Sequence, residues 1–152
     1  MVCENDYGGI MFDRIKDLRE YEDYSMSQVA KKLNVSKSTY SMWEYGRDVI
    51  PIKRLVNLAN VYHVKIDYLM NLTDNRKNTD LYSEIDNKVV ANNLCKLREN
   101  LNLTQDKIAK MIHISRSTWE SYEQGRVLIT TIPLYELCKK YSLSVEYILF
   151  HK

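Results

Sequence analysis

Apolar residues recur along this chain at spacings of three and four, which is the pattern of amphipathic helices. Three groups in the first half follow it: Ile15, Leu18 and Tyr21 or Glu22; Val29, Ala30 and Leu33; and Leu55, Leu58, Ala59 and Tyr62. Only 4 glycines and 2 prolines interrupt the sequence, so few positions resist helix formation. The pattern predicts an all-helical protein.

Polar residues mark where the predicted helices begin. Ser25 and Thr104 are natural N-caps of a short helix, because their hydroxyls can accept hydrogen bonds from the first free backbone N–H groups. Ser36 and Ser115 cap the next helix after only a tight turn. Two short helices in immediate succession are therefore predicted twice in the chain.

Glycine marks the end of the second helix of each pair. These helices stop at Gly46 and Gly125, where glycine can take the left-handed conformation of a helix end. A fourth helix carries Leu55, Leu58 and Tyr62, and a short fifth helix carries Ile66, Tyr68 and Leu69, matched by Val145, Tyr147 and Ile148. Five short helices in about 60 residues form a compact bundle.

The chain repeats itself without a gap when it is aligned on itself at a shift of 79 residues. The matched segments are Leu18-Arg19-Glu20 with Leu97-Arg98-Glu99, Ser36-Lys37-Ser38-Thr39 with Ser115-Arg116-Ser117-Thr118, and Glu44-Tyr45-Gly46-Arg47 with Glu123-Gln124-Gly125-Arg126. A repeat of about 60 residues is too long for one unit of a solenoid. We expect two domains, residues 1–72 and 86–152, and a linker of residues 73–85 that is polar at first.

Composition limits the class of protein. With 45% apolar and 28% charged residues, the chain is typical of a soluble globular protein. No stretch approaches the ~18 apolar residues of a membrane span, and Glu4 and Asp6 stand where a signal peptide would carry positive charge. We therefore expect no membrane association and a cytoplasmic location.

Candidate chemistry is sparse. The cysteines Cys3, Cys95 and Cys138 are widely spaced and lack a histidine at metal-ligand spacing, so neither disulfides nor a zinc site is predicted. Cys138 is interpreted as a small core residue, and His113 as a surface or turn residue. No nucleophile, carboxylate pair or glycine-rich phosphate loop stands at catalytic spacing. We expect no enzymatic activity, no metal and no cofactor.

Charge alone does not indicate the partner. The formal net charge is +2, with 12 basic and 11 acidic residues up to residue 78, and 10 basic and 9 acidic residues after it. Neither half has the basic excess by which many nucleic-acid-binding proteins are recognised. The partner must be inferred from motifs.

The second repeat carries a spaced set of such motifs. Its segments are Leu103-Thr104-Gln105, Ile108-Ala109, Ile114-Ser115-Arg116-Ser117-Thr118-Trp119 and Tyr122-Glu123-Gln124-Gly125-Arg126. With them the chain resembles the helix-turn-helix family of the phage Cro and repressor proteins, also called the xenobiotic-response-element (XRE) type. The first repeat resembles it equally. The resemblance implies an all-α protein of two tandem five-helix, lambda-repressor-like DNA-binding domains, each with its third helix in the DNA major groove.

The helical period gives this third helix one polar face. The outward residues are Lys37, Ser38, Ser41 and Met42 in the first repeat, and Arg116, Ser117, Glu120 and Ser121 in the second. The inward residues are Tyr40 and Trp43, and Trp119 and Tyr122. Arg116 fits a bidentate contact to guanine and Lys37 a looser one. A solvated helix surface is the alternative interpretation, and the tandem resemblance favours DNA.

The resemblance also places phosphate contacts around this helix: at the start of the second helix, at the N-caps and after the glycine. The candidate DNA-binding residues are Ser25, Met26, Ser36, Lys37, Ser38, Thr39, Met42, Arg47, Thr104, Gln105, Ser115, Arg116, Ser117, Thr118, Ser121 and Arg126. The first repeat departs from the family at Met26, where glutamine is favoured, because methionine cannot bridge a phosphate and a recognition-helix side chain. The first module is therefore expected to bind DNA more weakly or to serve as a dimerisation surface.

Two repeated ion pairs are expected to be structural. Arg19 with Glu44, and Arg98 with Glu123, resemble the family's internal pair that joins the first helix to the end of the third. We therefore do not count these residues among those that read DNA.

The expected function is a sequence-specific transcriptional regulator of bacterial or phage type that binds double-stranded DNA, with repression as the expected mode. The linker spans at most ~43 Å when extended, enough to place two recognition helices one DNA turn (~34 Å) apart. The chain can thus act as an intramolecular pseudo-dimer, with a homodimer as the other arrangement. Because the sequence ends soon after the second module, no small-molecule domain is expected. The alternative function is a protein-interaction module of the antirepressor or antitoxin kind.

Overall fold

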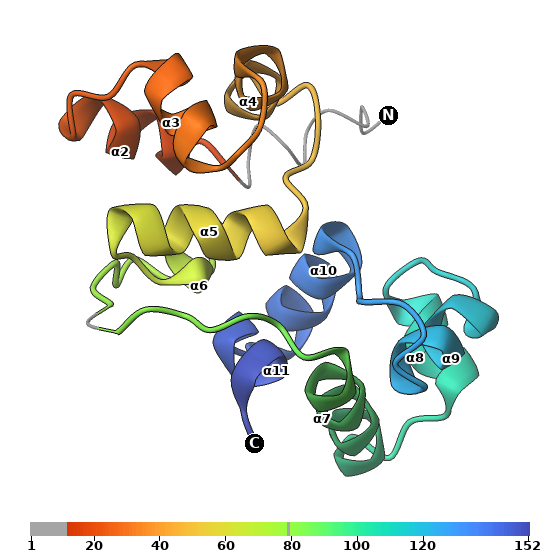
Figure 1. Ribbon diagram of the computed structural model, residues 1–152. Coiled ribbons are helices and arrows are strands. Elements are labelled where there is room, and N and C mark those ends of the chain that lie inside the picture. The colour runs from red at the N-terminus through yellow and green to blue at the C-terminus, as the bar shows by residue number, and fades with distance from the viewer. Residues whose placement is uncertain (1–11, 79) are drawn as a thin grey trace. The chain divides into compact units, whose positions relative to one another are not determined.

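The computed structural model describes residues 12–78 and 80–152, and it divides into two units, residues 1–82 and 83–152 (Figure 1). The described residues form ten helices and no strand; an isolated bridge joins Val64 and Lys77. The predicted all-helical class is confirmed. No helix in the described part of the chain is long and apolar enough to cross a membrane.

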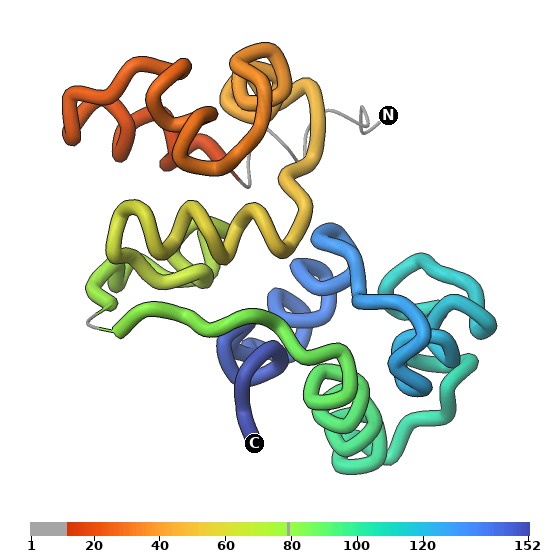
Figure 2. The backbone as a smooth tube through the Cα atoms, viewed as in Figure 1, coloured from red at the N-terminus to blue at the C-terminus, as the bar shows by residue number. Residues whose placement is uncertain are grey.

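In the described residues, each unit has five helices in the same order. The first unit has α2 (Arg14–Tyr21), α3 (Met26–Lys32), α4 (Lys37–Glu44), α5 (Ile52–Tyr62) and α6 (Ile66–Leu69). The second unit has α7 (Asn87–Asn100), α8 (Gln105–Met111), α9 (Arg116–Glu123), α10 (Thr131–Tyr141) and α11 (Val145–Phe150). Figure 2 traces this sequence of short helices and turns along the backbone. The internal repeat of the sequence is therefore also a repeat of the helix order.

Side-chain caps start the helices where the sequence predicts them. The hydroxyls of Ser25, Thr104, Ser36 and Ser115 each accept a hydrogen bond from the backbone N–H three residues later, at 3.1–3.2 Å. At Ser25 the bond is reciprocal, because the Gln28 side chain accepts from the Ser25 N–H at 2.7 Å. Local chemistry thus fixes the entry to both helices of each pair.

Residues with positive φ end the helices. Gly46 and Gly125 have φ values of 66° and 68°, which confirms the predicted left-handed helix ends. A Cβ added to Gly125 would meet its nearest neighbours at 3.6 Å, an ordinary contact, so backbone conformation is what favours glycine there. His113 lies exposed in the turn after α8 with φ 60°, in agreement with its predicted turn role.

The aromatic core residues of α4 and α9 are as predicted, but their identities are exchanged. Tyr40 and Trp43 are buried in the first unit, and Trp119 and Tyr122 in the second, each pair in edge-to-face contact at 6.4–6.5 Å between ring centroids. The positions that match across the repeat therefore hold tyrosine in one module and tryptophan in the other. Cys138 is 1% exposed, which confirms its core role.

One predicted core position is wrong. Tyr21 is 71% exposed and Glu22 is also exposed, whereas Ile15 and Leu18 are buried. Tyr21 is the last residue of α2, and its ring lies 5.4 Å from the Arg76 guanidinium instead of in the core. Cys3, Glu4 and Asp6, which entered the sequence argument, lie outside the described residues.

Most of the predicted linker, residues 73–82, belongs to the first unit. The backbone N–H of Lys65 donates to the Arg76 carbonyl at 3.0 Å, next to the bridge at Lys77. Asn60 and Tyr82 exchange two hydrogen bonds, at 2.8 and 3.0 Å. The second unit begins at Ser83, four residues before α7. Unlike an extended linker, most of this segment is held against its own module.

The first and last helices of each unit are joined by matching residues. Arg14 of α2 donates to the carbonyls of Tyr68 and Thr73, at 2.9 and 2.6 Å. Asn93 of α7, which occupies the corresponding position, donates to the carbonyls of Ile148 and His151 at 3.1 and 2.8 Å. Two different side chains thus satisfy backbone carbonyls at the C-terminal end of each module.

Candidate nucleic-acid interface

Each unit contains two short helices joined by a tight turn. In the first unit α3 packs against α4, and in the second α8 packs against α9. Ala30 and Ala109, which are 2% and 1% exposed, lie inside α3 and α8 and are small enough for a close approach of the helices. This is the geometry of a helix-turn-helix unit, in which the second helix presents its outer face to a partner.

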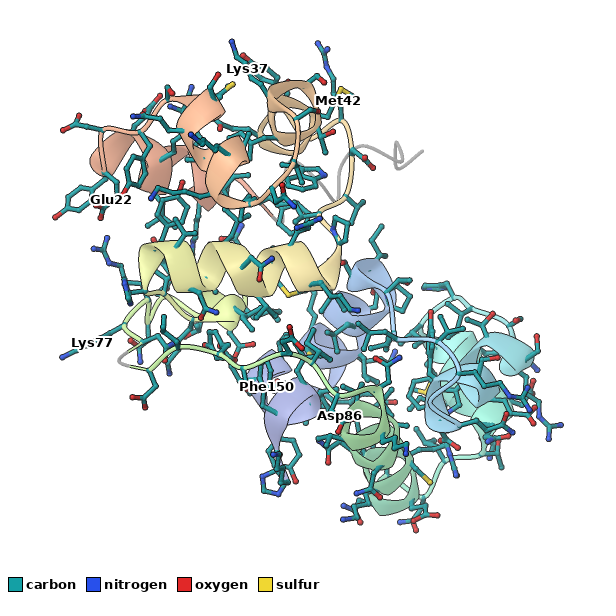
Figure 3. The ribbon with its side chains drawn as sticks, in the orientation of Figure 1. Glu22, Lys37, Met42, Lys77, Asp86 and Phe150 are labelled. Carbon is teal, nitrogen blue, oxygen red and sulfur yellow. The ribbon has the colours of Figure 1, made fainter. Side chains whose placement is uncertain are left out.

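The outer face of α4 is formed by Lys37, Ser38, Ser41 and Met42, which we call the first recognition face. Lys37 and Ser38 are exposed, and Met42 is 39% exposed. Figure 3 shows Lys37 and Met42 on the side of α4 that faces away from α5. The Ser41 hydroxyl donates to the Ser38 carbonyl at 2.9 Å, so it lies against its own helix. This face therefore combines one cation with an apolar side chain.

The outer face of α9 is formed by Arg116, Ser117, Glu120 and Ser121, the second recognition face. Arg116 and Ser117 are exposed, whereas Glu120 and Ser121 are half-buried. The Ser121 hydroxyl donates to the Ser117 carbonyl at 3.0 Å. The Gln124 side-chain amide donates to Glu120 Oε1 at 3.0 Å. This face therefore presents a cation and an oriented carboxylate.

A group of hydroxyls surrounds the first turn of both recognition helices. Ser36 Oγ lies 3.0 Å from Ser38 Oγ and 2.9 Å from Thr39 Oγ1. The matching oxygens around Ser115 lie at 3.0 and 2.8 Å. These groups sit at a helix N-terminus, where partial positive charge and hydroxyl donors both favour a phosphate. Thr39 and Thr118 are half-buried and bond to the cap, so they support it.

The arginine that follows each glycine is exposed and its backbone is fixed. The N–H groups of Arg47 and Arg126 donate to the carbonyls of Met42 and Ser121, at 2.8 and 3.1 Å. The Arg47 guanidinium also lies 5.8 Å from the Tyr45 ring. Both arginines are thus positioned at the end of the recognition helix with their charge open to solvent, as a phosphate contact requires.

The start of the second helix differs between the modules. Gln105 Nε2 donates to Glu123 Oε2 at 2.8 Å, which links α8 to the end of α9. Met26, at the matching position, is half-buried and has no group that could make such a bond. The structure therefore shows the link from Gln105 to the recognition helix and its loss in the first module.

The two ion pairs predicted as structural are present. Arg19 donates to both oxygens of Glu44, at 2.6 Å from Nη2 to Oε1 and 3.0 Å from Nε to Oε2. Arg98 Nε lies 2.5 Å from Glu123 Oε1. The carboxyl side chains of Glu44 and Glu123 are only 1% and 6% exposed. These four residues hold the first helix to the end of the third and do not face the solvent.

Glu123 has a larger set of donors than Arg98 alone. Trp119 Nε1 donates to Glu123 Oε1 at 2.7 Å, in addition to Gln105. Burial alone would raise the pKa of the Glu123 carboxyl, but the hydrogen bonds from Arg98, Gln105 and Trp119 outweigh it and lower this pKa. The carboxylate therefore stays ionised inside the module.

Two exposed apolar residues near the interface were missed by the sequence argument. Tyr45 is 65% exposed and Val127 is 52% exposed, and both stand in the segment that follows the recognition helix. Helical periodicity gives no signal for them, because they lie outside the helices. Their exposure gives this border of each recognition helix an apolar component beside the arginines.

Two family comparisons match this architecture. Residues 15–69 match the family described as "Helix-turn-helix", and residues 91–152 match the family described as "Helix-turn-helix domain". Both modules are thus helix-turn-helix domains, the class whose members bind DNA in transcriptional regulators. The chain belongs to this family as a tandem member of the XRE type, which confirms the resemblance inferred from the motifs.

The chain is also similar to regulators of Bacillus subtilis (strain 168). It is 38% identical over 61 residues to the uncharacterized HTH-type transcriptional regulator YobD, covering 40% of this chain and 54% of that protein. It is 30% identical over 79 residues to the HTH-type transcriptional regulator ImmR, covering 51% of this chain and 62% of that protein. The chain thus spans little more than half the length of these relatives. No solved structure matches the chain significantly.

Proposed function

We propose that this protein is a sequence-specific DNA-binding transcriptional regulator of bacterial or phage type, and that it acts as a repressor. The main observation is that the same interface is built twice: an exposed polar face on the second helix of a helix-turn-helix, hydroxyls at its N-terminus and an exposed arginine after its glycine. The similarity to proteins named transcriptional regulators supports the proposal.

In this proposal the groups around α4 and α9 have two duties. The side chains of the two recognition faces meet base edges in the major groove. The phosphate contacts come from Ser25, Ser36 and Arg47 in the first module and from Thr104, Gln105, Ser115 and Arg126 in the second. With a net charge of only +2, specific contacts must supply a large share of the affinity.

We further propose that both modules act on one operator. We take the domains as residues 1–72 and 86–152, with residues 73–82 folded against the first, and two arrangements are open: an intramolecular pseudo-dimer and a homodimer of the chain. In either arrangement the bound protein blocks access of polymerase to the operator, which is the simplest route to repression for a DNA-binding protein.

The test is in-vitro selection of random duplex DNA by the purified full chain at ~150 mM salt. We expect a motif of two half-sites whose binding withstands this salt, since phosphate contacts alone would be unselective and would weaken steeply. A second measurement, transcription from a promoter that carries the selected site, should show repression. Unselective binding, or activation of the promoter, would contradict the corresponding part of the proposal.

A protein-interaction role is the second candidate, and a specific observation favours it for the first module. Met26 replaces a hydrogen-bonding side chain, and Met42 is an exposed apolar residue on the recognition face. A first module that has turned to a protein partner would leave a selected motif with one half-site. If the motif instead has two half-sites, and Lys37→Ala removes the contribution of one of them, both modules contact DNA.

A further inference from the structure

The two recognition faces are built on the same frame and differ in chemistry. Both helices share their N-cap, their hydroxyl group, their buried aromatic pair and their terminal glycine. The differences fall on three outward positions: Lys37 against Arg116, Ser41 against Glu120, and Met42 against Ser121. Because these side chains are not part of the core, folding does not require the differences. We therefore relate the differences to what each face binds.

The side chains of the second recognition face match the chemistry of a particular pair of bases. Arg116 and Glu120 lie one turn apart, about 6 Å along the axis of α9. A guanidinium only donates hydrogen bonds and fits the two acceptors of guanine, whereas a carboxylate only accepts and fits the amino group of cytosine. The bond from Gln124 orients the Glu120 carboxylate, so its direction is set before DNA arrives.

Glu120 also acts by exclusion. A carboxylate close to DNA phosphates is unfavourable unless a base donates to it, because like charges repel. Guanine and thymine present acceptors in the major groove and would leave the carboxylate unpaired, and adenine sets the acceptor N7 beside its amino group, which disfavours a side chain that only accepts. The second module should therefore reject them at the position that Glu120 faces, by the same principle that lets unpaired groups discriminate between partners.

The first recognition face has a different preference. Met42 is 39% exposed and offers an apolar contact that matches the methyl group of thymine. Ser41 bonds its own helix and is neutral, so nothing on this face excludes an acceptor. Lys37 supplies a single charge in place of the forked donors of Arg116. This face therefore tolerates A·T pairs and gains from a thymine.

We propose that the two modules read two unlike half-sites, and this rests on the proposed function as a DNA-binding regulator. The second module takes a half-site with a guanine for Arg116 and a cytosine for Glu120. The first module takes a half-site with a thymine for Met42 and no required cytosine. The operator is then asymmetric, unlike the palindrome that a homodimer of a single module reads.

The experiment compares the wild-type full chain with one variant by selection of random duplex DNA. The variant, Lys37→Arg with Ser41→Glu, Met42→Ser and Tyr45→Gln, gives α4 the second recognition face together with the amide that orients its carboxylate. We expect two unlike half-sites for the wild type and two like half-sites for the variant. All four positions are outward and not in the core, and an unchanged melting temperature checks that the fold is kept.

The other possible outcomes of the selection distinguish a failure of this inference from a failure of the proposed function. Two identical half-sites, or one half-site only, in the wild-type pool would overturn this inference and leave DNA binding by the regulator intact. No enrichment of any sequence would overturn the proposed function and the inference with it. The wild-type pool thus separates the two failures.

A single substitution tests the role of Glu120. Glu120→Gln keeps the size of the side chain but adds a donor, and glutamine pairs with adenine. We expect the preferred base at one position of one half-site to change from cytosine to adenine, with a ratio change of about tenfold. Glu136→Gln on α10, outside the recognition faces, is the matched control and should leave the motif unchanged. Retention of cytosine by Glu120→Gln would overturn the assignment.

Discussion

The two modules share a helix order but differ around the carboxylate that ends the recognition helix. In the second module Glu123 accepts hydrogen bonds from Arg98, Gln105 and Trp119. Among the described residues of the first module, Arg19 is the one that donates hydrogen bonds to Glu44. The cause is local: glutamine is replaced by methionine at the start of the second helix, and the tryptophan and tyrosine of the core exchange places. A single carboxylate can therefore be held by one donor residue or by three within the same fold.

The exchange of aromatic residues leaves a buried hydroxyl in the first module. Tyr40 stands where the second module has Trp119, and it is 0% exposed. Its hydroxyl and that of Tyr62 interact electrostatically with each other and with Glu44, without hydrogen-bond geometry. A phenol in this place is a less complete partner for the carboxylate than the indole N–H.

Removal of each carboxylate should give the largest loss of stability in its module. Glu123→Ala leaves the buried donors of Arg98, Gln105 and Trp119 unpaired, and we expect a loss of about 4 kcal/mol in unfolding free energy. Glu44→Ala leaves only Arg19 and should cost about 3 kcal/mol. Urea unfolding of the full chain measures both values. Losses below about 1 kcal/mol would show that the buried ion pairs do not stabilise the modules.

Each module can be followed separately, because the chain has 2 tryptophans and they lie in different units. In a Trp43→Phe background the fluorescence of Trp119 reports the second module, and in a Trp119→Phe background Trp43 reports the first. Glu99→Ala is the control for charge removal, since Glu99 is exposed on α7. This control should change the stability by less than about 0.5 kcal/mol.

The buried tyrosines predict that alkali weakens the first module. Burial raises the pKa of Tyr62 to about 12 and that of Tyr40 further still. Because both folded pKa values lie above the unfolded value of ~10, the stability they hold is present below pH ~10 and is lost as the pH rises beyond it. At pH 11 the loss should be ~3 kcal/mol relative to pH 8.

The comparison with the second module isolates Tyr40. Tyr141, the counterpart of Tyr62, also has a raised pKa because of burial, but Trp119 does not titrate. The alkaline loss of the first module should therefore exceed that of the second, and Tyr40→Phe should remove about half of it. Equal alkaline losses in both modules, followed through the two tryptophans, would show that Tyr40 does not contribute.

The recognition faces predict unequal contributions to DNA affinity. Arg116→Ala removes a forked donor and should weaken binding to the selected duplex by about 2 kcal/mol, whereas Lys37→Ala should weaken it by about 1 kcal/mol. Fluorescence anisotropy at ~150 mM salt measures both constants. Equal losses would contradict the unequal division between the modules.

A structural feature of these modules could be predicted from the sequence when residues close to it in the chain determine it. The caps at Ser36 and Ser115 and the left-handed glycines were predicted, because a few neighbouring residues determine them. The prediction for Tyr21 failed because spacing alone does not tell whether an apolar residue in the last turn of a helix has a core to pack against. The bonds between Asn60 and Tyr82 lie 22 residues apart, and nothing in the local pattern announces them. The DNA-reading roles of the recognition faces remain predictions.

The smallest expected effect is that of a substitution at the start of the second helix. Gln105→Met removes one of three donor residues from a buried carboxylate and should lower the stability of the second module by about 1.5 kcal/mol, because hydrogen bonds to charged groups exceed neutral ones. The reverse change, Met26→Gln, should alter the first module by less than about 0.5 kcal/mol. Arg19 already donates to both oxygens of Glu44, so a new amide has little left to satisfy.

An equal gain from Met26→Gln would mean that Glu44 is under-bonded by Arg19, and that methionine at this position weakens the first module. If Met26→Gln leaves the stability unchanged but tightens DNA binding, the explanation is different. The glutamine would then act on phosphate and not on the carboxylate, and Met26 would be the reason for weaker DNA binding by the first module. Two measurements on Met26→Gln distinguish these explanations. Urea unfolding reports the internal hydrogen bond to Glu44, and fluorescence anisotropy reports the contact with DNA.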